Sequence, residues 1–254
     1  MSVLVRLLIA LVVIGVCAAV AWWAFRPAPA AQEENGAGVS AQSTTLPLFE
    51  RVVVSGRVGA TPTIEIKAPL EVDGSKATTL VKGDGREITE GSPVLVAITA
   101  FDGETGQTLS EFGRPQLSLG IVGTDVIGED LTNMVIGQQE GSRLIAFRTI
   151  APGAGAPGST SNVEVDVIDI LPSIAVGTAV DASVGPLSVE INPNGPIITH
   201  GSTVPDGVTT QMLIKGDGVQ VHESDRVVAQ FTALGWTDGV VRVSTWETGV
   251  PQVI

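Results

Sequence analysis

The sequence predicts an α+β fold dominated by an antiparallel β-sheet, and three observations support this prediction. Thirty glycines and fifteen prolines spread over 254 residues favour short strands and turns over long helices. Runs such as Val94–Ala100 and Val163–Ile170 alternate apolar residues with others, which is the two-residue period of a strand. The third observation is a single helix candidate, Glu129–Ile136, with apolar residues at i, i+3 and i+4.

The chain begins with a segment that predicts a single transmembrane helix. Leu7–Phe25 is nineteen residues without a charge, close to the roughly 20 that a helix needs to cross a bilayer. Trp22 and Trp23 stand at its outer end, where indole rings favour the membrane interface. Arg6 and the amino group precede it and favour a cytoplasmic amino end. We therefore expect residues 1–26 to be an anchor in the cell membrane, with the bulk of the chain extracytoplasmic.

Two alternatives to an uncleaved anchor stay open for residues 1–26. A signal peptide cut after Ala28-Pro29-Ala30 fits the small-x-small pattern, and a lipoprotein signal would use Cys17. The anchor and both alternatives export the rest of the chain. Residues 27–45 are small and polar without periodicity, which predicts a disordered spacer.

The exported part contains an internal repeat. The motif Lys82-Gly83-Asp84-Gly85 recurs at an offset of 133 as Lys215-Gly216-Asp217-Gly218. The same offset carries Val94–Ala100 onto Val227–Ala233 and Gly106 onto Gly239, and upstream Ile64–Ile66 echoes Val189–Ile191. The repeat predicts a first module at 46–171 and a second, truncated module at 172–254.

Each element of the first module has its own signal. The Asp-Gly pair at 84–85 predicts a tight turn with a glycine at positive φ. The strand at 94–100 follows, with Val94, Val96 and Ile98 on one face. Acids in the first turn and Gly137 delimit the helix Glu129–Ile136, and Pro172 stops the closing strand. A sheet covered by one short helix is an α+β domain.

The motifs, taken in chain order, resemble the FKBP-type peptidyl-prolyl cis-trans isomerases, and more narrowly their tandem, exported actinobacterial forms. The resemblance covers about Leu80–Leu171 in the first copy and only the first half of the family pattern, from Met212, in the second. It implies an FKBP-like fold and an action on proline-containing segments of exported proteins. The motifs that carry it are Gly83-Asp84-Gly85, Glu90–Val96, Thr105-Gly106, Leu131, Val135-Ile136-Gly137 and Gly141-Ser142-Arg143.

The resemblance also implies where a proline pocket would lie. In the family a prolyl ring stacks on a tryptophan floor between aromatic walls, whereas this chain has Leu131 at the floor and Ile98 at a wall tyrosine position. An aliphatic pocket still buries a prolyl ring but offers neither ring stacking nor a phenolic donor. We therefore expect weak isomerase activity. The candidate pocket residues are Ile98, Leu109, Leu117, Ile127, Leu131, Val165 and Phe231, and the competing interpretation is that the aliphatic ones are ordinary core.

Composition narrows the remaining function classes. Residues 1–26 hold Arg6, Arg26 and no acids, so residues 27–254 carry 12 basic against 27 acidic groups, a formal charge of −15, which argues against nucleic acid as a partner. His200 and His222 stand apart without metal-ligand spacing, and nothing in the sequence suggests a cofactor. The leading hypothesis is a tethered FKBP-like isomerase. Its alternatives are a catalytically inert envelope scaffold and a pair of immunoglobulin-like adhesion domains, against which the helix argues.

Overall fold

The computed structural model describes residues 46–123, 126–151, 161–180, 187–192, 195–218, 220–223, 225 and 227–254. The predicted anchor at 1–26 and the predicted spacer at 27–45 lie outside these described residues. Within the described ranges no helix is both long and apolar enough to span a membrane.

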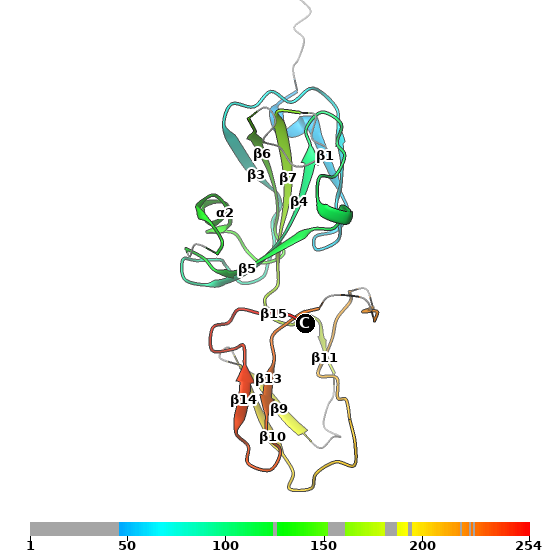
Figure 1. Cartoon of the computed structure of the whole chain (residues 1–254), viewed down its shortest axis with the longest axis vertical. Coiled ribbons are helices and arrows are strands. Elements are labelled where there is room, and N and C mark those ends of the chain that lie inside the picture. Colours follow the sequence, from blue (N-terminus) through cyan, green and yellow to red (C-terminus); the bar gives the residue numbers. More distant parts are fainter. Residues whose placement is uncertain are drawn as a thin grey trace, which may run out of the picture. The chain divides into compact units, whose positions relative to one another are not determined.

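The first copy is built on a five-stranded antiparallel sheet with the order β3-β6-β7-β4-β5 (Figure 1). This sheet and its single helix confirm the predicted mostly antiparallel architecture. The strand that comes last in sequence, β7, lies in the middle, where it pairs with both β4 and β6. The strands are β3 (Ser75–Val81), β4 (Pro93–Asp102), β5 (Gln116–Ile121), β6 (Arg143–Thr149) and β7 (Val163–Leu171).

One face of the sheet packs against helix α2 (Glu129–Val135), which lies where the sequence predicted it (Figure 1). Val135 is fully buried there, with Leu131 and Met134 packed against the same cluster. The glycines on either side, Gly128 and Gly137, have φ of 76° and 77°, a region that side chains with a Cβ rarely adopt. Even-numbered residues of β4, β6 and β7 supply the sheet side of this core: Val94, Val96, Leu144, Ala146, Ile168 and Ile170.

The opposite face is covered by the hairpin of β1 (Val52–Ser55) and β2 (Thr63–Ile66), which follows the short 3₁₀ helix η1 (Leu48–Arg51). Phe147 is fully buried on this face, and its ring centroid lies 5.3 Å from that of Phe49. The alternation in Val163–Ile170 indicated a strand with one buried face, but every residue from Val163 to Ile170 is buried. The reason is that β7 is central and has a cover on both faces.

A buried ion pair ties the hairpin to the sheet. The Arg143 guanidinium donates to both carboxylate oxygens of Asp169, at 2.6 and 2.7 Å, and the two side chains are 2% and 4% exposed. The same guanidinium donates to the carbonyl oxygens of Gly56 and Arg57 in the loop between β1 and β2. The pair is thus fully hydrogen-bonded, the condition under which a buried charge is tolerated.

The second copy has smaller sheets, each of two antiparallel strands. They pair β8 with β11, β9 with β10, β12 with β15 and β13 with β14. The strands are β8 (Thr178–Ala179), β9 (Leu187–Asn192), β10 (Gly195–His200), β11 (Ile214–Lys215), β12 (Val228–Ala229), β13 (Thr232–Leu234), β14 (Val241–Ser244) and β15 (Gln252–Val253).

The two copies share one turn in atomic detail. Gly106 and Gly239 adopt φ of 69° and 65°, so each needs a residue without a Cβ. Two backbone hydrogen bonds recur at the offset of 133: Asp102 N to Gln107 O and Gly106 N to Asp102 O in the first copy, Gly235 N to Val240 O and Gly239 N to Gly235 O in the second.

The shared Lys-Gly-Asp-Gly motif behaves differently, and the expectation of a positive φ at Gly85 is wrong, since Gly85 is not among the glycines with positive φ. Glycine is required in the first copy by a close approach of two backbones. A Cβ on Gly83 would lie 2.2 Å from the Glu140 carbonyl oxygen, and one on Gly85 would lie 2.8 Å from the Glu140 Cβ. In the second copy the nearest described atom would be 3.9 Å from a Cβ on Gly216.

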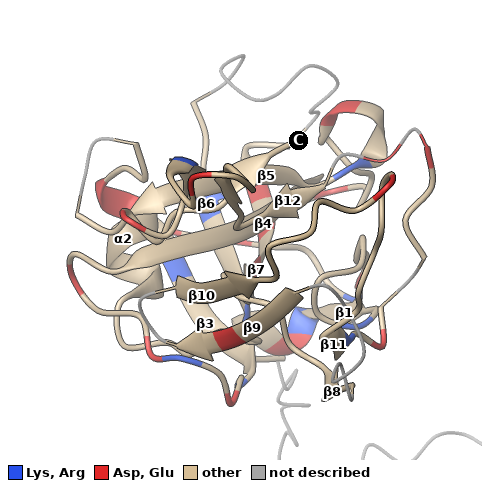
Figure 2. Ribbon diagram, turned by 90° about the horizontal axis from the view of Figure 1, so that it is seen from below, with Lys and Arg blue, Asp and Glu red and all other residues tan. Residues whose placement is uncertain are grey.

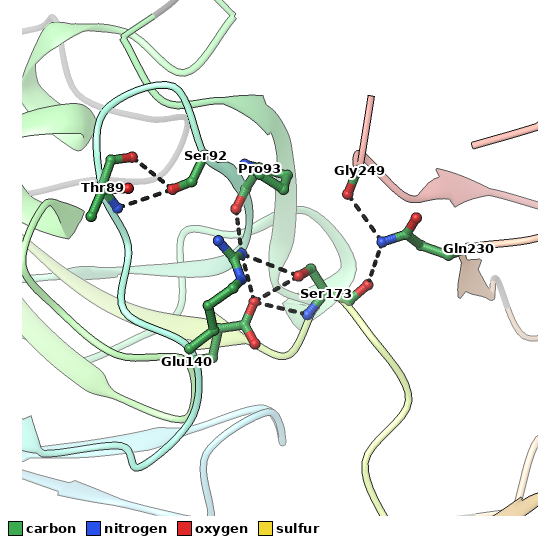
Figure 3. Close-up of polar contacts among 8 residues, drawn as sticks. Thr89, Ser92, Pro93, Glu140, Ser173, Gln230 and Gly249 are labelled. Atoms are coloured by element: carbon green, nitrogen blue, oxygen red, sulfur yellow. Dashed lines mark hydrogen bonds and ion pairs between the residues drawn. The ribbon is translucent and has the colours of Figure 1, made fainter. Parts of the chain in front are cut away.

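Glu140 is also the centre of a polar junction at the end of β7 (Figure 3). Its Oε1 accepts hydrogen bonds from Arg86 Nη2 at 2.8 Å and from the backbone N and the hydroxyl of Ser173 at 3.1 and 2.7 Å. The Ser173 carbonyl oxygen in turn accepts from Gln230 Nε2 at 2.9 Å, and the same amide donates to Gly249 O at 3.0 Å. The first residues after the sheet are therefore fixed in place.

Candidate functional site

A broad hollow of about 1900 Å³ lies beside helix α2, and five of the candidate pocket residues contribute to its lining. Ile98 and Leu131 are half-buried against the core under α2, and Ile127 is 5% exposed in the segment that leads into the helix. The hollow exceeds the roughly 300–1,000 Å³ of ordinary small-ligand sites, and its lining also includes Gln220, Val221, Asp225 and Val253 of the second copy. The five lining candidates are Ile98, Leu109, Leu117, Ile127 and Leu131.

Leu117 approaches the hollow from the opposite face of the sheet. Strand register pairs Ile98 with Gln116 and Ala97 with Leu117. Because directly paired residues of antiparallel strands share a face, Gln116 stands beside Ile98 and Leu117 does not. The side chain across from Ile98 is therefore an exposed amide.

Val165 and Phe231 lie elsewhere. Val165 is fully buried in the core under the β1–β2 hairpin, on the face of the sheet away from α2. Its neighbour Asp166 pairs with Ala100 and so lies on the face of Ile98 and Ile168. Phe231 belongs to the second copy, where it is half-buried and its backbone N donates to Thr245 Oγ1.

The hollow has a polar part that the sequence analysis missed, formed by Arg148, Glu164 and Asp166. The Arg148 guanidinium donates from Nε to Asp166 Oδ2 at 2.9 Å and from Nη2 to Glu164 Oε1. The two acids are 4% and 8% exposed, whereas the side chain of Arg148 is 52% exposed. The sequence feature that could have indicated this cluster is the pair of acids two residues apart in a predicted strand, because such residues share a face of the sheet.

Burial controls the protonation of this cluster. The pKa of Asp166 is raised to about 6, chiefly because burial removes the carboxylate from water. The Arg148 guanidinium lowers this pKa, and the negative charge of Glu164 raises it. The pKa of Arg148 is raised by the two carboxylates, although its own partial burial acts in the opposite direction. Asp166 is therefore mostly ionised at neutral pH and becomes protonated as the pH falls below about 6.

Aromatic rings contribute little to the hollow. Of the two phenylalanines that contact it, Phe147 has its ring in the opposite core. Phe112, in the 3₁₀ turn η2 (Glu111–Gly113), is 88% exposed at the rim and adopts φ of 54°, which is strained for a bulky residue. Within the described lining no tryptophan or tyrosine supplies a stacking floor. The site can therefore bury an apolar group on aliphatic side chains beside buried carboxylates.

The chain is similar to a number of solved structures, and two of them show how limited the likeness is. No protein-family model matches the chain, and no curated protein matches it. It is similar to the N-terminal domain of FKBP42 from Arabidopsis thaliana, with a TM-score of 0.29 and 10% identity over 46% of this chain and 97% of that one. It is also similar to a multi-domain immunophilin from Arabidopsis thaliana, with a TM-score of 0.31 and 11% identity over 50% of this chain and 51% of that one. TM-scores of this size establish neither a common fold nor a common activity.

Proposed function

We propose that the chain is an FKBP-like protein, tethered to the cell membrane by residues 1–26 with its bulk extracytoplasmic, that binds proline-containing segments of exported polypeptides. The observation that carries this proposal is the aliphatic wall formed by Ile98, Ile127 and Leu131 next to α2. A prolyl ring placed there loses water from its methylene groups, each worth about 0.8 kcal/mol when fully buried.

Isomerase activity at this site is expected to be weak. Rotation about an Xaa-Pro bond is slow because amide resonance sets a barrier of roughly 18–20 kcal/mol. A dry pocket lowers the barrier by disfavouring the planar, charge-separated amide, and a well-placed donor stabilises the twisted one. The aliphatic wall supplies a dry surface, but the half-exposed side chain of Arg148 keeps water nearby.

The test compares binding and turnover in residues 46–254. Binding of a Leu-Pro peptide is followed by chemical-shift perturbation, and isomerisation by exchange spectroscopy between the cis and trans signals. We expect shifts at Ile98 and Leu131 and a rate close to that of the free peptide. Ile98→Tyr with Leu131→Trp is expected to raise the rate, whereas Val81→Tyr, at an exposed residue outside the hollow, is not. Absence of any binding would overturn the proposal, and a fast wild-type rate would overturn the weak activity.

A catalytically inert envelope scaffold is the second candidate function. The observation that favours it is the set of two-stranded sheets in the second copy, whose strand edges are open to pairing. Replacing proline by alanine in the peptide separates the two functions. A proline-binding site loses affinity, whereas a surface that only pairs strands does not.

The proposed tethering to the membrane is tested in a bacterium that expresses the full chain. Protease added to intact spheroplasts is expected to digest the chain beyond residue 45, while alkaline carbonate is expected to leave the protein in the membrane pellet. Complete release into the carbonate supernatant would contradict an uncleaved anchor and favour a cleaved signal peptide.

A further inference from the structure

The floor of the hollow carries more negative than positive charge. One guanidinium, that of Arg148, serves both Glu164 and Asp166, so the cluster has a net charge of −1 when both acids are ionised. Around it, acidic residues of the first copy outnumber basic ones in the lining: Glu111, Glu129, Asp130, Glu164 and Asp166 against Lys76, Arg114 and Arg148. Figure 2 shows the acidic first turn of α2 beside the sheet.

Asp166 has an unused acceptor. Its Oδ2 accepts from Arg148, but no group among the described residues donates to its Oδ1, although the residue is only 8% exposed. Buried polar atoms are almost always hydrogen-bonded, and leaving one without a donor is costly. A ligand that brings a donor to Oδ1 therefore gains more here than at a solvated carboxylate, and a cationic donor also neutralises the excess charge.

Asp166 stands at a fixed distance from the aliphatic wall. Asp166 lies two residues along β7 from Ile168, and Ile168 pairs with Ile98. Asp166 is therefore about 7 Å along the sheet from the level of Ile98. An extended ligand advances by the same amount in two residues. When the prolyl ring of a bound segment lies at Ile98, the ligand residue two positions from the proline therefore lies at Asp166.

We propose that the hollow recognises segments in which a lysine or arginine lies within about two residues of the proline, with Asp166 as the group that binds the cation. This inference rests on the proposed function and names its substrate class. Asp166, Glu164 and Arg148 act as a specificity site beside an apolar wall. The described residues contain no group of three metal-ligating side chains, so a side-chain cation suits the site better than a metal ion.

The experiment titrates residues 46–254 with four blocked peptides that contain one Leu-Pro unit. Lysine stands two residues from the proline on either side in two of them, and six residues away in the third. The fourth carries norleucine in place of lysine, which keeps the aliphatic stem without the charge. We expect at least one near-lysine peptide to bind about tenfold more tightly than the norleucine and distant-lysine peptides. Equal affinity for all four would overturn the inference but leave the proposed function standing, whereas no binding by any of them would overturn both.

Two variants separate recognition at Asp166 from long-range attraction to an acidic protein. Asp166→Asn is expected to reduce the preference for near lysine over norleucine, measured within the same variant, to less than about twofold. Asp73→Asn makes the same change of charge at an exposed position outside the hollow and is expected to keep the preference. Equal losses in both variants would overturn a local role for Asp166.

The pH profile of the unaltered protein gives a readout that needs no variant. Protonation of Asp166 between pH 7.5 and pH 5 removes the charge that a lysine pairs with, so the preference for near lysine is expected to disappear over that range. The charged groups that face Asp166 directly are Arg148 and Glu164. The hollow is also lined by these charged residues of the first copy: Lys76, Glu111, Arg114, Glu129 and Asp130. A preference that persists unchanged at pH 5 would contradict the assignment to Asp166.

Discussion

The two copies of the repeat share a turn and a motif, but among the described residues only those of the first copy form a buried apolar core. All of the buried hydrophobic side chains of the described residues lie between Val52 and Ile170. Every described large apolar side chain of the second copy is half-buried or exposed, with Val208 at 100% and Val204 at 61%. This difference shows that repeating the sequence pattern of the strands is not sufficient to form a buried apolar core.

The matched strands make the same point at single residues. Val94 and Val96 are fully buried in β4, which lies between β5 and β7 and under α2. Their counterparts at the offset of 133, Val227 and Ala229, are only half-buried, because β12 pairs with the two-residue strand β15 alone. Burial is therefore decided by what packs on a strand and not by its own alternation.

The largest expected effect concerns independent folding. Residues 46–171, expressed alone, are expected to unfold in one cooperative transition, because they contain both cores. Residues 172–254 are expected to show no such transition and poor amide dispersion, because burial must offset about 1–2 kcal/mol of backbone entropy per ordered residue. Calorimetry and NMR spectra check both fragments. A cooperative monomer formed by 172–254 would remove the contrast between the copies.

The next effect contrasts a buried with an exposed ion pair in residues 46–254. Arg143→Met leaves Asp169 buried without its charged partner and is expected to cost about 3–5 kcal/mol of unfolding free energy. Arg242→Met removes the pair with Asp238 in the second copy, where both side chains are about half exposed, and is expected to change the free energy of unfolding little. Urea unfolding measures both. Similar losses would show that the second copy contributes to the same cooperative unit.

A smaller effect tests the shared glycine motif. Gly83→Ala places a Cβ against backbone atoms of Glu140 and is expected to cost about 1–3 kcal/mol, the range typical of overpacking. Gly216→Ala meets no described atom closer than 3.9 Å and is expected to change the melting temperature little. If Gly216→Ala proves equally costly, the motif of the second copy packs against a backbone segment as the first one does.

The smallest effect is a pH dependence confined to the first copy. The pKa of Asp166 is raised in the folded state to about 6 from 3.8, so the folded protein holds this proton more tightly than the unfolded chain does. Stability from this group is therefore fully present below about pH 4 and is lost as pH rises through about 6. The check is the unfolding free energy of wild type and Asp166→Asn at pH 4, 5, 6 and 7.5. Wild type is expected to lose stability relative to the variant as the pH rises from 4 to 7.5, which is the opposite of the behaviour of an ordinary paired carboxylate.

The sequence predicted the helix at Glu129 and the antiparallel sheet, because local periodicity and end signals carry that information. Five of the candidate pocket residues line the hollow, but Val165 and Leu117 stand on the face of the sheet opposite to Ile98. In a strand a shift of one residue moves a side chain to the other face, and register is set by pairing with distant strands. The ion pair of Arg143 with Asp169 depends on the same long-range strand pairing, so no local sequence pattern predicted it.

The central position of β7 has a consequence for the order of events during synthesis. Strands β3, β4, β5 and β6 all leave the ribosome before β7, yet β4 and β6 are held together only through it. Contacts so distant in sequence form slowly, because closing the intervening loops costs entropy first. Nascent chains stopped before Val163 are expected to stay sensitive to protease, and chains that extend past Ser173 are expected to become resistant. Until that point the first copy has unpaired strand edges, which make a nascent chain prone to aggregate.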